Sequence, residues 1–193
     1  MNDMIKDFRL PRYAEIPTVG LYLEQVIRYL NEKLAPLGCI DVTPSMVSNY
    51  VKKGYIARPV KKIYGEEQIA GLFFLVIAKQ VLPMDSLNML MNIQRERYSP
   101  QRAYDYFCEE LERMLKSIYG QGDAVSEIEK DAAPEKKMLR SLIIAVSHSI
   151  HLTNFFRSGR FSPPVPASQA RASQSQRGTA SARPARIIEK RVK

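Results

Sequence analysis

The sequence predicts an all-α fold. Apolar residues recur at the 3.6-residue spacing of amphipathic helices, and no run alternates between apolar and polar as a strand does. The pairs Thr43-Pro44 and Ser99-Pro100 mark helix starts, because a hydroxyl caps the first turn and proline fits its first position. With 193 residues, 45% of them apolar, the chain has room for one folded domain with an appendage.

The front of the chain is predicted to be an extended arm followed by a helix. Residues 1–17 form the arm, because Pro11 and Pro17 push the residues before them out of the α region. A helix is expected over residues 20–35, ended by the turn residues 36–38. Its apolar face consists of Leu23, Val26, Ile27, Leu30 and Leu34.

The next two helices are expected at residues 43–53 and from Glu66 onward. Thr43 caps the first helix, and Gly54 ends it, because glycine readily takes the left-handed conformation of a helix C-terminus. The second helix is apolar almost all round over residues 69–78. We therefore expect this second helix at the centre of the domain.

Three further helices complete the prediction. A short helix opens at residues 83–86, a longer one follows Ser99-Pro100, and a last one spans residues 134–156 after a break at residues 120–123. Apolar stripes on the last two consist of Tyr104, Phe107, Cys108, Leu111, Met114 or Leu115, and Ile118, and of Leu139, Leu142, Ile143, Val146 and Ile150. The longest apolar stretch, residues 72–78, is too short to cross a bilayer, so no membrane span is predicted.

These elements divide the chain into an arm (1–17), a helical domain (18–93), a helical extension (94–156) and a tail (157–193). The tail is rich in Ser, Ala, Pro, Gln, Gly and Arg. Such a segment cannot bury enough apolar surface to offset its chain entropy, so we predict that the tail is disordered. The two cysteines are too few for a disulfide framework, which is typical of a cytoplasmic protein, and both are expected in the core.

The net charge of +9 is concentrated in the tail, which carries +8, whereas residues 1–156 carry only +1. A nucleic-acid hypothesis therefore has to rest on local charge in the folded body. One basic locality stands out, with five cations in eleven positions and no acid among them. Its members are Lys52, Lys53, Arg58, Lys61 and Lys62.

The helix expected at residues 43–53 presents two different faces. At 100° per residue, Met46, Val47, Tyr50 and Val51 fall on one side, and Ser45, Ser48, Asn49 and Lys52 fall on the other. Short polar side chains and a cation can hydrogen-bond to base edges and phosphates in a major groove. The alternative is the solvated face of an ordinary helix. The polar face, the local charge and the short turn together favour DNA binding.

Residues 42–56 resemble the recognition helix of MerR-type regulators, in which a Ser/Thr-Pro start leads to a Tyr four residues before a Gly, followed by two apolar residues. Residues 62–69 resemble the junction between their wing and third helix, and residues 83–91 resemble their fourth helix. The resemblance implies a winged helix-turn-helix with a short wing at residues 57–61. It implies that Tyr64 lies beside the DNA backbone; the alternative for Tyr64 is a core tyrosine.

Residues 8–118 resemble more closely an uncharacterised bacterial family, the domain of unknown function 1836. The matching features are residues 8–11 (FRLP), 21–26 (LYLEQV), 49–52 (NYVK), and Lys62 with Tyr64. The resemblance implies membership of the MerR-like group of DNA-binding proteins.

No catalytic or cofactor motif is found: the sequence has no Gly-rich phosphate loop, no Cys-x-x-Cys and no His-Glu-x-x-His. We predict that the protein is not an enzyme and holds no cofactor or metal. His148 and His151 are expected as surface histidines, and Cys108 alone does not support metal sensing. Three acids are expected to face solvent: Glu109, Glu110 and Glu112.

The predicted function is that of a sequence-specific transcriptional regulator that binds double-stranded DNA as a homodimer. The helices of residues 99–156 are expected to pair two copies; the alternative is that the stripe on the last helix packs within its own chain. The main alternative function is a helical adaptor that binds another protein, and a membrane-surface role of the tail lacks an amphipathic pattern. The candidate DNA-binding residues are Ser45, Ser48, Asn49, Lys52, Lys53, Arg58, Lys61, Lys62 and Tyr64.

Overall fold

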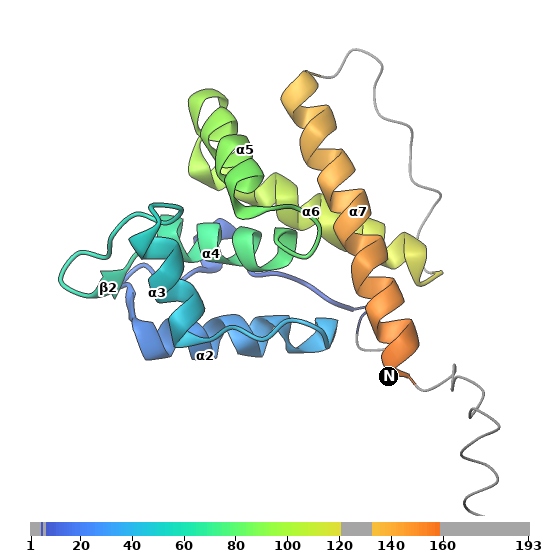
Figure 1. Ribbon diagram of the computed structural model, residues 1–193, viewed down its shortest axis with the longest axis horizontal. Helices are drawn as coiled ribbons and strands as arrows, with labels where there is room; N and C mark the ends of the chain where they lie inside the picture. Colours follow the sequence, from blue (N-terminus) through green and yellow to red (C-terminus); the bar gives the residue numbers. More distant parts are fainter. Residues whose placement is uncertain (1–4, 6, 121–132, 159–193) are drawn as a thin grey trace, which may run out of the picture. The chain divides into compact units, whose positions relative to one another are not determined.

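The computed structural model describes residues 5, 7–120 and 133–158, and these are mostly helical (Figure 1). The predicted tail beyond Ser158 and the break at residues 121–123 lie outside the described residues. Two 3-10 turns, η1 (Tyr13–Glu15) and η2 (Ala35–Leu37), accompany the α-helices. The helices are α2 (Leu23–Leu34), α3 (Pro44–Lys52), α4 (Glu66–Ala78), α5 (Met84–Arg97), α6 (Pro100–Ile118) and α7 (Pro134–Arg157).

Residues 35–43 connect α2 to α3. This connection is fastened by the amide of Asn31, which donates to the Val42 carbonyl at 2.9 Å and accepts from the Val42 N–H at 2.8 Å. Because both backbone groups of Val42 are satisfied, the loop before α3 has one fixed course. On the inner side of α2, Val26, Leu30 and Leu34 are buried, as the helical spacing predicted.

A two-stranded sheet was not expected from the sequence. Strand β1 (Leu21–Tyr22) pairs antiparallel with β2 (Ile63–Tyr64), with Leu21 opposite Tyr64. The expected helix at residues 20–35 therefore starts at Leu23. The prediction of no strand was wrong because two residues per strand are too few to show alternation, and the pairing joins segments about forty residues apart.

The sheet sets the backbone at Gly20, which has a φ of +73°. A Cβ added there would lie 2.4 Å from Cγ2 of Ile63, so a larger residue would push β2 away. Glycine is required at this position both for the left-handed conformation and for the close approach. The sheet therefore ties the start of α2 to the segment that leads into α4.

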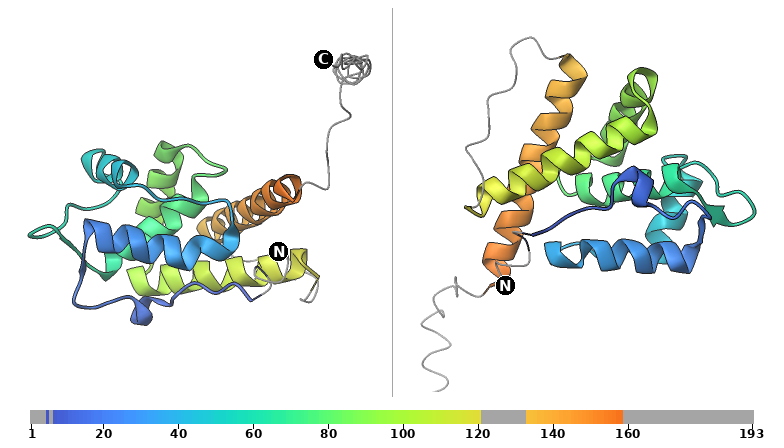
Figure 2. Two further views of the ribbon diagram at one scale, coloured as in Figure 1. Left: turned by 90° about the horizontal axis from the view of Figure 1, so that it is seen from below. Right: turned by 180° about the vertical axis from the view of Figure 1, so that it is seen from behind.

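Helix α4 lies at the centre, as predicted, with eight of its residues buried. Views from below and behind show α2 on one side of it and α6 on another (Figure 2). The apolar stripes of α6 and α7 are also buried within this single chain, and the two helices pack against each other. The alternative that the α7 stripe packs back within its own chain is thus realised. The buried stripes therefore give no argument for self-association through residues 99–156, which stays a prediction.

Two of the three acids expected in solvent are buried. Glu110 and Glu112 are 9% and 8% exposed, whereas Glu109 is exposed as predicted. Glu112 accepts from the Leu10 N–H at 2.9 Å and from both terminal nitrogens of Arg12 at 2.6 and 2.7 Å. Glu110 faces arginines of α6 and α7. Local spacing could reveal only the α6 partner of Glu110, because the other partners lie on the arm and on α7.

Candidate nucleic-acid interface

Local capping fixes both ends of α3. The Thr43 hydroxyl accepts from the Met46 N–H at 3.3 Å, and Pro44 occupies the first turn, as predicted. At the other end, Gly54 has a φ of +78°, and the Tyr55 N–H donates to the Tyr50 carbonyl at 2.9 Å. This is a Schellman arrangement, which satisfies carbonyls of the last turn. The two caps hold a nine-residue helix in place without help from its outer face.

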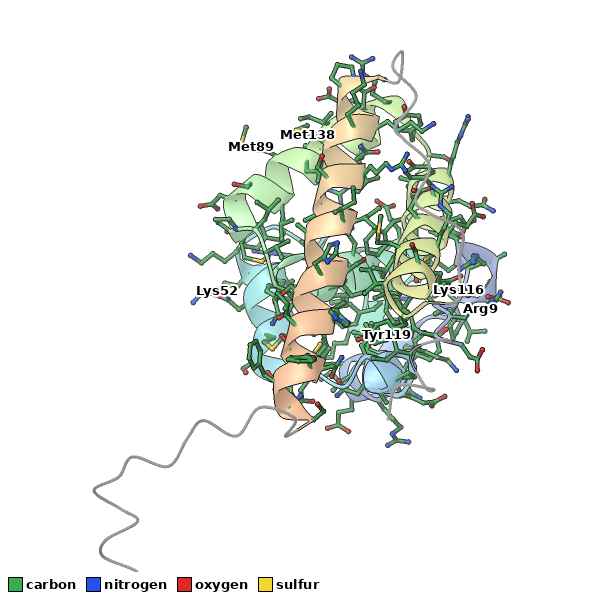
Figure 3. All side chains as sticks on the ribbon, turned by 90° about the vertical axis from the view of Figure 1, so that its right-hand side faces the viewer. Arg9, Lys52, Met89, Lys116, Tyr119 and Met138 are labelled. Atoms are coloured by element: carbon green, nitrogen blue, oxygen red, sulfur yellow. The ribbon has the colours of Figure 1, made fainter. Side chains whose placement is uncertain are left out.

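The two faces of α3 have the environments that the sequence predicted. Val47 and Tyr50 are 0% and 4% exposed and belong to the core. Figure 3 shows Lys52 at the edge of the molecule, pointing outward from α3. Four polar side chains of the opposite face are exposed: Ser45, Ser48, Asn49 and Lys52. The Ser45 hydroxyl lies 3.0 Å from that of Thr43, whereas the Asn49 amide has no partner among the described residues.

A loop of residues 57–63, closed by one isolated β-bridge between Val60 and Ile63, extends beside α3 at the end of the molecule away from α6 and α7 (Figure 1); we call this loop the hairpin. Its tip is closed by the Ile63 N–H, which donates to the Val60 carbonyl at 2.9 Å. The two central residues, Lys61 and Lys62, have positive φ values of 50° and 69°, as in a type I′ turn. This conformation costs a lysine about 1 kcal/mol. Both lysines are exposed at the tip, as is Arg58 nearby.

The base of the hairpin is anchored by Gln68 of α4. Its Nε2 donates to the Ala57 carbonyl at 2.9 Å, and its Oε1 accepts from the Gly65 N–H at 2.7 Å. One side chain therefore joins the start of the hairpin, its end and the first turn of α4. Gln68 thus fastens the base of the hairpin to α4, whereas Val60, Lys61 and Lys62 at its tip are exposed.

The positive charges of the five interface cations are not compensated by acidic side chains among the described residues. Within residues 5, 7–120 and 133–158, none of Lys52, Lys53, Arg58, Lys61 and Lys62 has an ion-pair partner. Elsewhere in the body, several arginines are paired with carboxylates, for example Arg12 with Glu112 at 2.6 Å and Arg9 with Glu15 at 2.9 Å. Unpaired cations on one locality produce a positive field that attracts polyanions.

Tyr64 does not lie on this surface. It is 5% exposed, and burial raises the pKa of its hydroxyl. The structure thus matches the alternative of a core tyrosine.

Sequence reasoning missed two neighbours of the interface. Val60 is 75% exposed beside the lysines of the tip. Its only signal in the sequence was that it is an apolar residue within a basic loop. Lys79 lies behind α3 with its Nζ 3.6 Å from Sδ of Met46, and burial lowers its pKa.

Within the described part of the chain, no group of three or more His, Cys, Asp or Glu side chains that could hold a metal occurs. His148 is exposed, and His151 packs edge-on against the Tyr119 ring, with 5.1 Å between centroids. Cys108 is fully buried, as predicted, and burial raises the pKa of its thiol to about 12, which keeps it protonated. No described helix is long and apolar enough to span a bilayer.

Comparison with known proteins identifies one relationship. A family model described as a domain of unknown function (DUF1836) matches residues 11–107. The match covers about half of the chain and contains α3, the hairpin and α4. No curated protein and no solved structure matches the chain.

Proposed function

We propose that this chain, which belongs to the DUF1836 family, is a sequence-specific DNA-binding protein that regulates transcription. In this proposal it is a MerR-like winged helix-turn-helix protein. The outer face of α3 enters the major groove, and the hairpin of residues 57–63 contacts phosphates. Cations position the protein on the duplex, and the polar side chains of α3 discriminate between bases.

One observation carries the proposal. An exposed helix face of short polar side chains lies beside a hairpin that presents lysines, and the five cations of this surface lack ion-pair partners among the described residues. A surface that serves only to keep a protein in solution does not need two lysines held at positive φ, a conformation that the backbone adopts at a cost. Positive charge on a protruding turn next to a capped helix is the arrangement that fits a duplex.

The proposal is tested by two substitutions with different expected results. Asn49→Ala should cost about 1–3 kcal/mol of binding at the specific site and relax the preference at one base position, because the amide can pair with adenine. Lys61→Ala should weaken binding to all sequences alike, because a phosphate contact is lost. The slope of the logarithm of the binding constant against the logarithm of the salt concentration should become shallower by about one unit. Both are measured by titration of the full chain against a selected site and a random duplex at several salt concentrations.

Matched controls come from exposed residues on other helices. Asn92→Ala on α5 and Lys116→Ala on α6 remove the same side chains from outside the interface. All four variants should unfold at the wild-type temperature, because the side chains are exposed. The adaptor alternative expects no effect of Asn49→Ala or Lys61→Ala on DNA binding, so equal affinities of all four variants would reject the proposal.

Removal of residues 158–193 is expected to leave site discrimination intact. The specific surface lies on α3 and the hairpin, whereas the removed segment carries much of the net positive charge. Affinity for random duplex should fall and become less sensitive to salt. The ratio of specific to non-specific affinity measures this, and a truncated, folded protein without site preference would place the binding element in the removed segment.

Two copies are proposed to bind one DNA site. Proteins that read the major groove with one short helix usually gain specificity from two half-sites, which requires a pair of molecules. Because the stripes of α6 and α7 are buried within one chain, the pairing surface has to lie elsewhere. Sedimentation of the protein with a duplex should show two chains per site, and saturation at one chain would limit the proposal to a single half-site.

A further inference from the structure

A hollow with a cavity volume of about 80 Å³ lies between α4, α5, α6 and α7 and opens to solvent. Four aromatic rings line it, and two of them, Phe74 and Phe107, meet edge to face with 5.1 Å between centroids. The other two belong to Tyr98, which ends α5, and Tyr104 of α6. Such walls fit a flat, apolar ring system.

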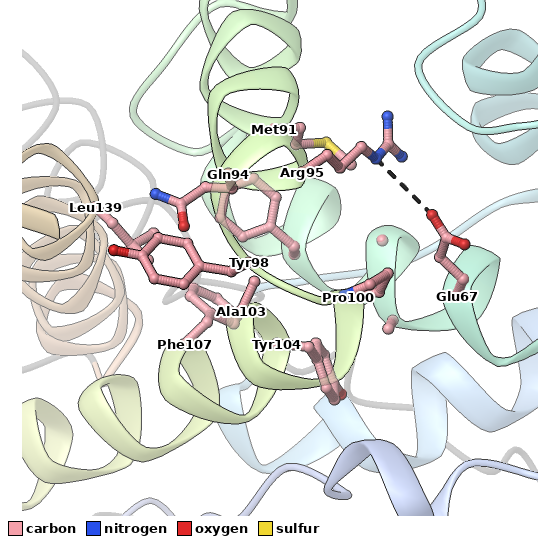
Figure 4. Close-up of a pocket in the computed structure, with 13 residues that line it drawn as sticks. Glu67, Met91, Gln94, Arg95, Tyr98, Pro100, Ala103, Tyr104, Phe107 and Leu139 are labelled. Atoms are coloured by element: carbon pink, nitrogen blue, oxygen red, sulfur yellow. Dashed lines mark ion pairs between the residues drawn. The ribbon is translucent and has the colours of Figure 1, made fainter. Parts of the chain in front are cut away.

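The polar groups of the hollow lie on two opposite sides (Figure 4). On one side, Nε of Arg95 lies 3.9 Å from a carboxylate oxygen of Glu67, so the two charges compensate each other at the rim. On the other side lie Gln94 and Tyr98, next to Leu139 of α7. The hollow therefore carries no uncompensated charge from its own walls.

Gln94 is a buried polar side chain of this hollow, with only 9% of its surface exposed. Its Nε2 donates to the Glu135 carbonyl at 3.4 Å, which fixes the orientation of the amide. Its Oε1 accepts no hydrogen bond from any described residue. This oxygen is not sealed from solvent, and a ligand that supplies an N–H replaces a contact with water by a direct hydrogen bond.

We infer that this hollow is a binding site for a planar aromatic molecule that donates an N–H to Oε1 of Gln94, such as a fused-ring nitrogen heterocycle. The rings lie between the side chains of Phe74, Tyr98 and Phe107, and the N–H points toward the α7 side. This inference does not depend on the proposed DNA binding, because no residue of α3 or the hairpin lines the hollow.

Indole and benzofuran are matched probes for this site. They have the same shape, but benzofuran carries an oxygen in place of the N–H. Indole should bind the full chain with a Kd of about 0.1–1 mM, and benzofuran should bind about tenfold more weakly, the loss of one hydrogen bond. Calorimetry measures both, and because the chain contains no tryptophan, the fluorescence anisotropy of indole reports its binding directly.

Two variants locate the site. In Gln94→Met, which keeps the length of the side chain, indole should bind as weakly as benzofuran, and benzofuran should bind as before. In Ala103→Phe, a ring fills the hollow, and both probes should lose binding. Gln101→Met on the exposed side of α6 is the matched control and should behave as wild type. Circular dichroism establishes that each variant is folded, and Gln94→Met alone tests the inference if Ala103→Phe does not fold.

Three results would overturn the inference. Equal affinity of indole and benzofuran for the wild-type chain would show that no N–H is recognised. Undiminished indole binding by a folded Ala103→Phe variant would place the site elsewhere. Absence of saturable binding by either probe up to its solubility limit would show that the hollow takes no ligand of this class.

Discussion

Tyr50→Ala should lower the free energy of unfolding by about 3–5 kcal/mol. The ring is 4% exposed and lies on the inner face of α3, so its removal leaves a cavity between that helix and the core. The backbone carbonyl of Tyr50 also receives the N–H groups of Tyr55 and Ile56, which form the cap of the helix. Displacement of the residue would therefore disturb the end of α3 as well as its packing. Chemical denaturation followed by circular dichroism measures the loss.

Tyr50→Phe separates the ring from its hydroxyl. No described residue forms a hydrogen bond with that hydroxyl. The free energy of unfolding of the phenylalanine variant should therefore lie within about 0.5 kcal/mol of the wild-type value. A loss of less than about 1 kcal/mol for Tyr50→Ala would show that α3 packs loosely and would contradict the placement of the ring. Together with Asn49→Ala, these variants distinguish the inner face of α3, which supports the fold, from the outer face proposed to bind DNA.

Glu112→Leu is expected to cost about 3–5 kcal/mol, because it leaves Arg12 and the Leu10 N–H without their acceptor. The side chains of Arg12 and Glu112 are 24% and 10% exposed, so water compensates the lost partner only in part. The hydrogen bonds from Arg12 to Glu112 raise the pKa of the guanidinium further above its usual value, so Arg12 remains charged at any pH at which the protein folds.

The neighbouring Glu109 provides the control. It is exposed, and Glu109→Leu should change stability by no more than about 0.5 kcal/mol. Adding Arg12→Met to Glu112→Leu should recover part of the loss, since the uncompensated charge is then removed. If the double variant is as unstable as Glu112→Leu, the cost arises from the Leu10 N–H and packing rather than from the charge of Arg12.

The positions of the helices could be predicted from the sequence because they depend on neighbours along the chain. Thr43 and Ser99 accept from the backbone three residues ahead, and Gly54 ends its own helix. The division of α3 into an inner and an outer face follows from the 100° rotation per residue alone. The candidate site was therefore predictable as an exposed surface, although its binding to DNA remains a proposal.

Only the tertiary structure decided the features whose partners are distant in sequence. Tyr64 is buried because β2 pairs with β1, and Gly20 makes that pairing possible. Glu112 is buried because the arm, 100 residues earlier, brings Arg12 to it, whereas Glu109 one turn away meets solvent. The stripes of α6 and α7 are buried because these helices pack within one chain, and the hollow around Gln94 arises where four helices meet. The sequence by itself determines which residues share a face of a helix, because that follows from local geometry; what covers the face depends on the whole chain, because burial is shared among segments that no local spacing relates.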